Sequence, residues 1–440
     1  MLGIIILSAG RGTRMKSSLP KVMHPIAGKP MLYHVLRAVQ SIQPYKIYAV
    51  SSEELKPHLK TMHSDGAFDV IIQEQPLGTG HAVRTALDHL DPNVTEVIIL
   101  SGDTPLITTD TLKQIKDIQA DIVVAGMPLA PEQLDKAYGR LRIENHQVMR
   151  IIEMKDASPE EKCIPFANAG VYKIKVDILK EILPRIENKN QAGEYYLTDV
   201  VHLAHEMGYQ NRLVLGAEDD FMGVNSRHEL SLAEGLMQDR LRLQHMNQGV
   251  TLIDPKTVYF QHDTVIESDV TIHPNVTFGS NVIVKSGVTI FQSCHIEKTT
   301  IGEYAKIGPF AHLRNHVELD EKTEIGNFVE IKNSTISKGS KIKHLSYIGD
   351  AEIGTKVNIG AGVITCNYNG FIKRKTTIGD GVFVGSNTAL IAPITLHPHS
   401  IVGAGSTLSQ DIESNDLVYN RAEVTIIKAG AITYKAKYKS

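Results

Sequence analysis

Residues 266–296 read IESDVTIHPNVTFGSNVIVKSGVTIFQSCHI, and a large apolar residue returns at every sixth position. A helix needs apolar spacings of three and four, and a half-buried strand alternates at two. A step of six is typical of a parallel β-helix of hexapeptide repeats, in which each hexad lays one short strand on a flat face. The main row is Ile266, Ile272, Phe278, Val284, Ile290 and Ile296, and a second row is Val270, Val276, Val282, Val288 and Cys294.

The ladder continues toward the carboxyl end with slips of phase that mark insertions. The largest interruption is Thr365–Thr377, a polar and basic stretch. Such an excursion from a solenoid is usually a functional loop. The later rows are Ile301, Ile307, Leu313, Leu319, Ile325 and Ile331; Ile336, Ile342 and Ile348; Ile353 and Ile359; and Ile378, Val384, Leu390, Leu396, Val402 and Leu408.

The first half of the chain has a different pattern, in which short apolar runs alternate with helical periodicity. This alternation predicts an α/β, Rossmann-like domain around a mainly parallel sheet. Ligands of such sheets bind beyond the carboxyl ends of the strands. The expected strands are Ile4–Leu7, Lys46–Val50, Val70–Ile72, Val97–Leu100 and Ile122–Val124, and the expected helices are Pro30–Gln40, His81–His89 and Thr111–Ile118.

A single long helix is predicted between the two patterns. Ser226 and Glu229 form a capping box at its start, and Gly249 supplies a stop. The expected domains are therefore residues 1–225, a linker helix at 226–249, and the β-helix at 250–440.

Composition excludes several classes of protein. A net charge of −3 over 440 residues offers no bulk attraction to nucleic acid or anionic lipid. The apolar run Ile4–Leu7 is too short for a signal peptide or a membrane span. Three scattered cysteines without metal-ligand spacing fit a reducing compartment. We expect a cytoplasmic protein with small-molecule partners and no stable membrane insertion.

A glycine-rich turn follows the first strand: Ser8-Ala9-Gly10-Arg11-Gly12-Thr13-Arg14-Met15, and then Leu19-Pro20-Lys21. Small residues let backbone N–H groups approach a triphosphate, and Arg14 and Lys21 neutralise its charge. The turn lacks the GxxxxGK[ST] of a Walker A loop and the third glycine of a dinucleotide fingerprint. It therefore predicts a nucleotide site of another kind.

These motifs resemble those of the sugar-1-phosphate nucleotidyltransferases. Together with the hexads, they are similar to a bifunctional family that joins N-acetylglucosamine-1-phosphate uridyltransferase to glucosamine-1-phosphate N-acetyltransferase, over residues 3 to about 425. The resemblance implies left-handed winding of the β-helix. It extends to Gln73–Gly80, Gly102–Leu106, Tyr138–Arg140, Glu153, Asn168–Gly170, Gly193–Asp199 and Gly223–Asn225.

The resemblance implies a role for each residue of the nucleotide site. Asp103 and Asn225 are expected to bind Mg²⁺, a cation that prefers oxygen ligands. Lys21 and Arg14 are the expected catalytic cations for attack of the sugar phosphate on UTP. The implied UTP and UDP-sugar contacts are Leu7, Ala9, Gly10, Lys21, Gln73, Gly78, Thr79, Gly139, Glu153, Asn168, Thr198 and Asn225.

An N-acetyltransferase also needs a base near neutral pKa, which suits histidine. His344, in the segment KHLSYIGD, resembles the catalytic base of the family, and Glu330 is expected to orient it. The implied glucosamine-phosphate contacts are Arg314, Lys332, Tyr347 and Asn358. The implied acetyl-CoA contacts are Asn367, Tyr368, Ser386, Ala404 and Arg421.

Two departures and two rival functions stay open. Ser101 stands where the family often has an aromatic residue, and Asn315-His316 replaces the usual Pro-Gly. The first rival is a monofunctional nucleotidyltransferase with a regulatory β-helix, and the second is a non-enzymatic solenoid that binds partners. The family resemblance also implies a homotrimer whose product feeds cell-envelope polysaccharides.

Overall fold

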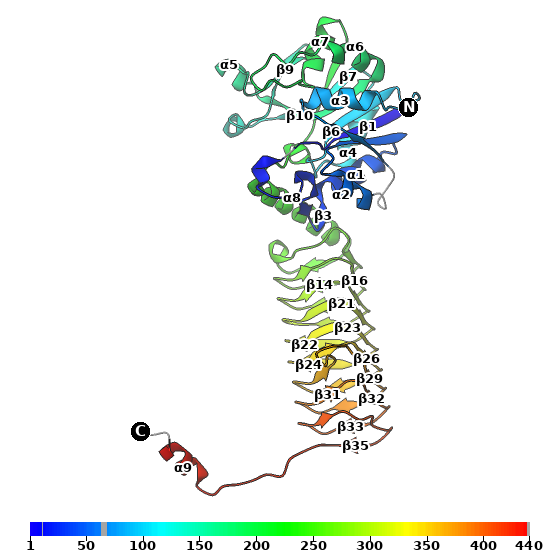
Figure 1. Cartoon of the computed structure of the whole chain (residues 1–440), viewed down its shortest axis with the longest axis vertical. Coiled ribbons are helices and arrows are strands. Elements are labelled where there is room, and N and C mark those ends of the chain that lie inside the picture. Colours follow the sequence, from blue (N-terminus) through cyan, green and yellow to red (C-terminus); the bar gives the residue numbers. More distant parts are fainter. Residues whose placement is uncertain (11, 63–67, 438–440) are drawn as a thin grey trace. The chain divides into compact units, whose positions relative to one another are not determined.

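A computed structural model describes residues 1–10, 12–62 and 68–437. The chain forms two compact units, Met1–Asp239 and Arg240–Ser440. The division falls within the long helix α8, Arg227–Asn247 (Figure 1). The predicted linker role of this helix and the boundaries at 225 and 249 stay predictions.

The first unit is built on a nine-stranded sheet of order β5-β4-β1-β6-β10-β7-β11-β9-β8. Each strand predicted from the sequence is present. Parallel pairing joins β1 to β4 and β6, but β10 runs antiparallel between β6 and β7. The sheet is therefore mainly parallel, as predicted, and only β10 and β9 run against the other strands. The strands are β1 Leu2–Leu7, β4 Lys46–Ser51, β5 Asp69–Ile72, β6 Glu96–Ser101, β7 Ile122–Pro128, β8 Arg140–Glu144, β9 Gln147–Ile152, β10 Phe166–Lys175 and β11 Asn211–Leu215, with the small hairpin β2 Pro25–Ile26 and β3 Lys29–Pro30.

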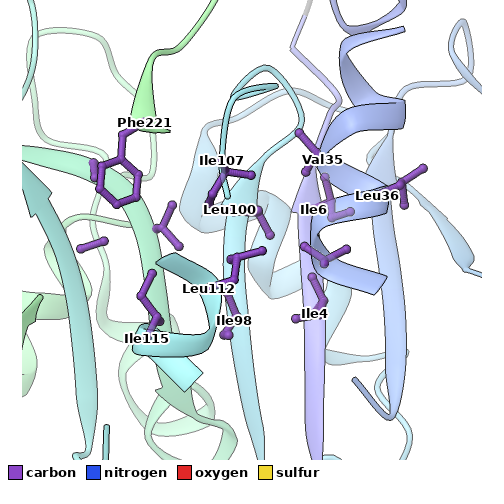
Figure 2. Packing of buried hydrophobic residues seen from close by; sticks show 14 of the residues in the cluster. Ile4, Ile6, Val35, Leu36, Ile98, Leu100, Ile107, Leu112, Ile115 and Phe221 are labelled. Carbon is purple, nitrogen blue, oxygen red and sulfur yellow. The ribbon is translucent and has the colours of Figure 1, made fainter. Parts of the chain in front are cut away.

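Helices cover both faces of this sheet, so its central strands are apolar throughout. Alternate residues of β1 enter different cores: Ile4 and Ile6 pack on one face and Ile5 on the other. Figure 2 shows the first face, where Val35 and Leu36 meet the strand residues. The helices are α1 Met31–Ser41, α2 Lys56–Met62, α3 Thr79–Leu87, α4 Thr109–Asp117, α5 Pro159–Lys162, α6 Val176–Ile182 and α7 Asp199–Glu206.

The second unit is the predicted parallel β-helix. Its short strands form a ten-stranded sheet and a 14-stranded sheet, in which the pairings between coils are parallel (Figure 1). The handedness of the winding stays a prediction. The ten strands are β12 Thr251–Leu252, β14 Thr271–Ile272, β17 Thr289–Ile290, β20 Lys306–Ile307, β22 Glu324–Asn327, β24 Lys341–His344, β27 Asn358–Ile359, β30 Phe383–Val384, β33 Ile401–Val402 and β35 Leu417–Val418.

The 14-stranded sheet covers the remaining faces of the β-helix. The insertion predicted at Thr365–Thr377 overlaps the ends of β28 and β29, and residues 367–375 lie between these strands. Its strands are β13 Val265–Ile266, β15 Thr277–Phe278, β16 Val282–Val284, β18 His295–Ile296, β19 Thr299–Ile301, β21 His312–Leu319, β23 Glu330–Ile336, β25 Tyr347–Gly349, β26 Ala351–Ile353, β28 Ile364–Cys366, β29 Thr376–Ile378, β31 Ala389–Ile391, β32 Ile394–Leu396 and β34 Thr407–Leu408.

Beyond the last coil the chain carries a tail that ends in α9, Gly430–Lys437. Its apolar side chains are exposed, with Val424 at 86% and Ile426 at 80% of their full surface. Among the residues that the structure describes, no helix is both long and apolar enough to cross a lipid bilayer.

The stacking of the aliphatic rungs predicts how far a cavity in the core would lower the stability of the β-helix. Ile290 is fully buried and stacks in register between Ile272 and Ile307. Ile290→Ala should lower the free energy of unfolding of this unit by about 2–5 kcal/mol, because lost burial and a residual cavity add. Thr289→Ala, at the half-exposed neighbour, should cost less than about 1 kcal/mol. Urea unfolding followed by circular dichroism measures both, and equal losses would contradict the rung packing.

Candidate functional site

A cleft of about 600 Å³ opens at the carboxyl ends of β1, β5 and β6. It brings together residues far apart in sequence, as expected for ligand sites of parallel strands. The predicted residues that line it are Leu7, Ala9, Gly10, Lys21, Gln73, Gly78, Thr79 and Asp103.

The ammonium group of Lys21 joins two segments of this site. It forms an ion pair with Asp103 and donates a hydrogen bond to Asn225 Oδ1 at 3.0 Å. Gly12 makes this approach possible, because a Cβ added there would lie 2.6 Å from the Cβ of Lys21. A carboxylate oxygen and an amide oxygen therefore converge on one cation.

The oxygens of Asp103 and Asn225 fit a magnesium ion. They already share a cation, the Lys21 ammonium, so one ion can reach both. Magnesium is usually bound through one or two protein ligands together with substrate phosphates. No group of three or more His, Cys, Asp and Glu could hold a metal among the described residues. Phosphate oxygens would have to complete the shell.

Arg14 lines a second cleft of about 1300 Å³, which it shares with Asn225 and Tyr138. The hydrogen bond between Lys21 and Asn225 connects the residues of the two clefts. Arg11, quoted in the glycine-rich turn, lies outside the described residues.

Three of the predicted nucleotide contacts, Gln73, Gly78 and Thr79, lie next to the segment 195–197. Gln73 Nε2 donates to Gly78 O at 3.3 Å. Gly78 has φ 115°, and a Cβ there would lie 2.5 Å from the carbonyl oxygen of Tyr195. Thr79 Oγ1 accepts a hydrogen bond from Leu197 N at 3.0 Å. Only glycine at 78 allows this close approach of two backbones.

Glu153, after β9, and Thr198, before α7, form a partly buried polar pair. Burial raises the pKa of Glu153, and the Thr198 hydroxyl, which donates to its carboxylate at 3.1 Å, acts in the opposite direction. Asn168 N donates to Gly139 O at 2.8 Å. The structure therefore brings the segment of Glu153 next to that of Thr198, and the segment of Asn168 next to that of Gly139.

Arg140 is a functional candidate that the sequence analysis quoted but did not assign. Its side chain is completely buried and donates to the carbonyl oxygens of Leu134 at 2.6 Å, Lys162 at 3.2 Å and Tyr138. A buried guanidinium is tolerated only when it is hydrogen-bonded. Arg140 thereby fixes the loop that ends at Gly139.

The second site lies on the β-helix. Arg314 and Lys332 occupy the same position on consecutive coils. Arg314 donates to Glu330 Oε1 from Nε at 2.8 Å and from Nη2 at 2.5 Å. The ammonium of Lys373, from the inserted loop, lies beside Lys332 and lowers the pKa of Lys332. Lys373 was not singled out from the sequence; the basic composition of its loop was the available signal.

Glu330 does not contact the predicted base. The ring of His344 instead makes a hydrogen bond from Nδ1 to Asn327 Oδ1 at 2.8 Å. Asn327 and His344 are in register on consecutive coils, and the sequence analysis did not single out Asn327. Asn327, and not the expected Glu330, therefore orients the ring of His344.

One edge of the β-helix carries His344 and most of the predicted acetyl-CoA contacts. Ile342, Ile359, Val384 and Val402 are in register on consecutive coils. The residues two positions later therefore follow one edge, which we call the histidine edge: His344, Ala361, Ser386 and Ala404. A Cβ on Gly403 would lie 3.6 Å from Nη2 of Arg421, which places Arg421 at the end of this edge. Ala361 was not predicted.

Tyr347 and Asn367 meet near Arg314 and Lys332. Gly349 follows Lys332 in register, and a Cβ on Gly349 would lie 2.5 Å from Tyr347 Oη and 2.8 Å from Asn367 Nδ2. Two predicted residues stand apart: Asn358 lies in the ten-stranded sheet with His344, and the side chain of Tyr368 is 59% exposed.

Comparisons with known proteins cover the whole chain. Residues 4–134 match the family model of the MobA-like NTP transferase domain, and residues 295–404 match that of the GMPPB C-terminal domain. A bifunctional GlmU protein of Paramagnetospirillum magneticum is 43% identical, covering 99% of this chain and 97% of the relative. Those of Parvibaculum lavamentivorans and Rhodospirillum rubrum are 46% and 45% identical, covering 99% and 98% of this chain and 97% of each relative.

The pair formed by Glu153 and Thr198 predicts a pKa change. Thr198→Val removes the hydroxyl that stabilises the carboxylate and keeps the burial that favours the neutral acid, so the pKa of Glu153 should rise further. Thr198→Ser retains the donor and should leave the pKa close to that of the wild type. A titration of the Glu153 carboxyl ¹³C shift measures both variants. An unchanged or lower pKa in Thr198→Val would show that the hydrogen bond has no such effect.

Proposed function

This chain belongs to the family of bifunctional GlmU proteins, and from that premise we propose that each unit carries one of its two reactions. The protein is an enzyme of UDP-N-acetylglucosamine synthesis with uridyltransferase and N-acetyltransferase activities. Its product serves cell-wall synthesis. Family membership excludes the monofunctional enzyme and the non-enzymatic solenoid.

Uridyltransfer takes place in the cleft around Lys21. A phosphate oxygen of N-acetylglucosamine-1-phosphate attacks the α-phosphorus of UTP in line, the bond to the β-phosphate breaks, and pyrophosphate leaves. Lys21 and Arg14 neutralise phosphate charge, and the glycine-rich turn supplies backbone donors. Asp103 and Asn225 hold Mg²⁺, which neutralises further charge when bound. Positioning and charge neutralisation supply the catalysis, without a covalent enzyme intermediate.

The sugar is held by the second half of the same site. Glu153 accepts hydrogen bonds from sugar hydroxyls as a carboxylate, and Asn168 and the backbone of Gly139 complete the contact. Gln73, Gly78 and Thr79 read the uracil. The buried Arg140 contributes indirectly, because it fixes the backbone before Gly139.

Acetyltransfer takes place on the β-helix with His344 as the base. Asn327 Oδ1 accepts a hydrogen bond from Nδ1–H of His344, so the lone pair of the ring is on Nε2. Nε2 takes a proton from the amine of glucosamine-1-phosphate as the nitrogen attacks the thioester carbon of acetyl-CoA. The carbon–sulfur bond breaks, and the CoA thiolate leaves and takes up the proton from Nε2, which restores the base. Asn367, Tyr368, Ala361, Ser386, Ala404 and Arg421 are the proposed acetyl-CoA contacts.

The contact between Lys332 and Lys373 carries this assignment. Two ammonium groups side by side repel each other, and this repulsion lowers the pKa of Lys332. An anion between them removes this repulsion, and the substrate phosphate supplies one. Arg314 adds a third positive charge, and Tyr347 adds a hydroxyl. Asn358, on the neighbouring sheet with His344, is proposed to hold the sugar toward the base.

We further propose that the enzyme acts as a homotrimer in the cytoplasm, where UTP and acetyl-CoA are formed. The exposed apolar side chains of the tail support association, because a single chain leaves Val424, Ile426 and Ile427 in water. In the proposed trimer, Arg421, at the end of the histidine edge, faces the acetyltransferase site of a neighbouring copy.

Point variants should separate the two activities. His344→Ala should reduce acetyltransfer by about 10²–10⁴-fold, because the base is lost. It should leave UDP-sugar formation from supplied N-acetylglucosamine-1-phosphate unchanged. Asp103→Ala is the reciprocal control, since it removes a metal ligand and should abolish only uridyltransfer. Assays of thiol release and pyrophosphate release measure the two reactions. A variant that lost both activities, or neither, would refute the division.

Mixed trimers test whether the acetyltransferase site is shared. His344→Ala and Arg421→Ala chains should each be impaired alone. Refolded together at random, they should regenerate about a quarter of the sites, each with the intact histidine of one chain and the intact arginine of another. Light scattering should confirm a particle of three 48.5 kDa chains. Activity no higher than the mean of the two parents would mean that each chain completes its own site.

A further inference from the structure

Three residues stacked at one corner of the β-helix connect the coils to the inserted loop. They are Asn333, Asp350 and Asn367, which follow one another at intervals of 17 residues. One carboxylate oxygen of Asp350 accepts from Asn333 Nδ2 at 2.6 Å, and the other accepts from Asn367 Nδ2 at 2.5 Å. The carboxylate of Asp350 therefore lies between two amide groups, one on the preceding coil and one at the base of the loop.

Asn367 is the residue from which the loop is built. Its carbonyl oxygen accepts from Arg374 N at 2.8 Å, and Tyr368 pairs with Lys373 in an antiparallel bridge. Residues 367–374 thus form a small hairpin that is closed at Asn367. The orientation of Asn367 consequently fixes the position of Lys373, six residues later.

Asp350 holds this hairpin from both its side chain and its backbone. The Asn367 side chain is 7% exposed, so its amide needs a partner inside the protein. The carboxylate supplies a charge-assisted hydrogen bond, which is stronger than a bond between neutral groups. The Asp350 carbonyl also accepts from Thr376 N, at the far end of the insertion, at 3.2 Å. Both ends of the loop are therefore attached to one residue.

We infer that Asp350 is a positioning residue for acetyltransfer, which holds Asn367 against acetyl-CoA and Lys373 beside Lys332. The inference rests on the proposed function of the loop. Asp350 itself touches neither substrate: it acts through Asn367 and the hairpin. A purely structural corner residue would stabilise the coil without affecting the loop, so the two roles give different results.

The test compares two glycine variants at matched corner positions. Asp350 and Asn333 both have left-handed backbone, at φ 49° and 47°, which glycine adopts without strain. Asp350→Gly removes the hydrogen bond to the loop, whereas Asn333→Gly removes only the bond between coils. Trypsin cleaves after Lys373, Arg374 and Lys375, so the rate of cleavage at these residues measures how readily the loop opens. Asp350→Asn is the conservative variant, because its amide oxygen can still accept from Asn367.

Asp350→Gly should be cleaved in the loop at least about tenfold faster than the wild type and Asn333→Gly, because a charge-assisted bond is lost. Its KM for acetyl-CoA and glucosamine-1-phosphate should rise by a similar factor, with a smaller change in kcat. Asp350→Asn should be close to the wild type both in its rate of cleavage and in its KM values. Thermal melts should show that all three variants are folded, and uridyltransfer should be unchanged.

Equal cleavage rates in the two glycine variants would overturn the inference. Faster cleavage with unchanged KM values would overturn it as well, since the loop would then be held for no catalytic purpose. Failure of the proposed function would give a different result, which is seen in the wild type. The wild-type loop would resist trypsin, but the enzyme would not acetylate glucosamine-1-phosphate.

Discussion

The aliphatic rungs of the β-helix must stack on one another, and this constraint places the candidate functional side chains that lie on the coils. A rung out of register would expose apolar surface and leave strand hydrogen bonds unmade. Because the rungs repeat at 17 or 18 residues, side chains distant in sequence become neighbours. Arg314 reaches Lys332 and Asn327 reaches His344 in this way. The packing of the core therefore sets the spacing of these side chains.

In the first unit the ends of parallel strands impose a comparable constraint. Both faces of the sheet are covered by apolar side chains, so polar groups gather where the strands stop. The cation of Lys21 connects the loop after β1 with Asp103, after β6, and with Asn225, before α8. One side chain thus holds together three segments that must approach a triphosphate at the same time.

The sequence was sufficient for the patterns that repeat and insufficient for contacts that depend on register. The hexads predicted the β-helix, and the apolar runs predicted β1, β4, β5, β6 and β7. The antiparallel β10 was missed, because a buried strand reads the same in either direction. Asn327 was missed because its partner, His344, lies on the next coil, 17 residues later. Lys373 was missed because it lies in the insertion, where the hexad count stops. Arg140 was hidden by its burial, which no local pattern reveals.

The proposed acetyltransferase site depends on a phosphate held between Lys332 and Lys373, where coil register and the inserted loop bring two ammonium groups together. A crystal structure of the protein with glucosamine-1-phosphate and CoA would locate this phosphate. We expect the phosphate to contact both ammonium groups within hydrogen-bond distance, with the sugar amine directed toward Nε2 of His344. A phosphate bound away from both lysines, with the loop in the same position, would show that the two lysines do not form the site.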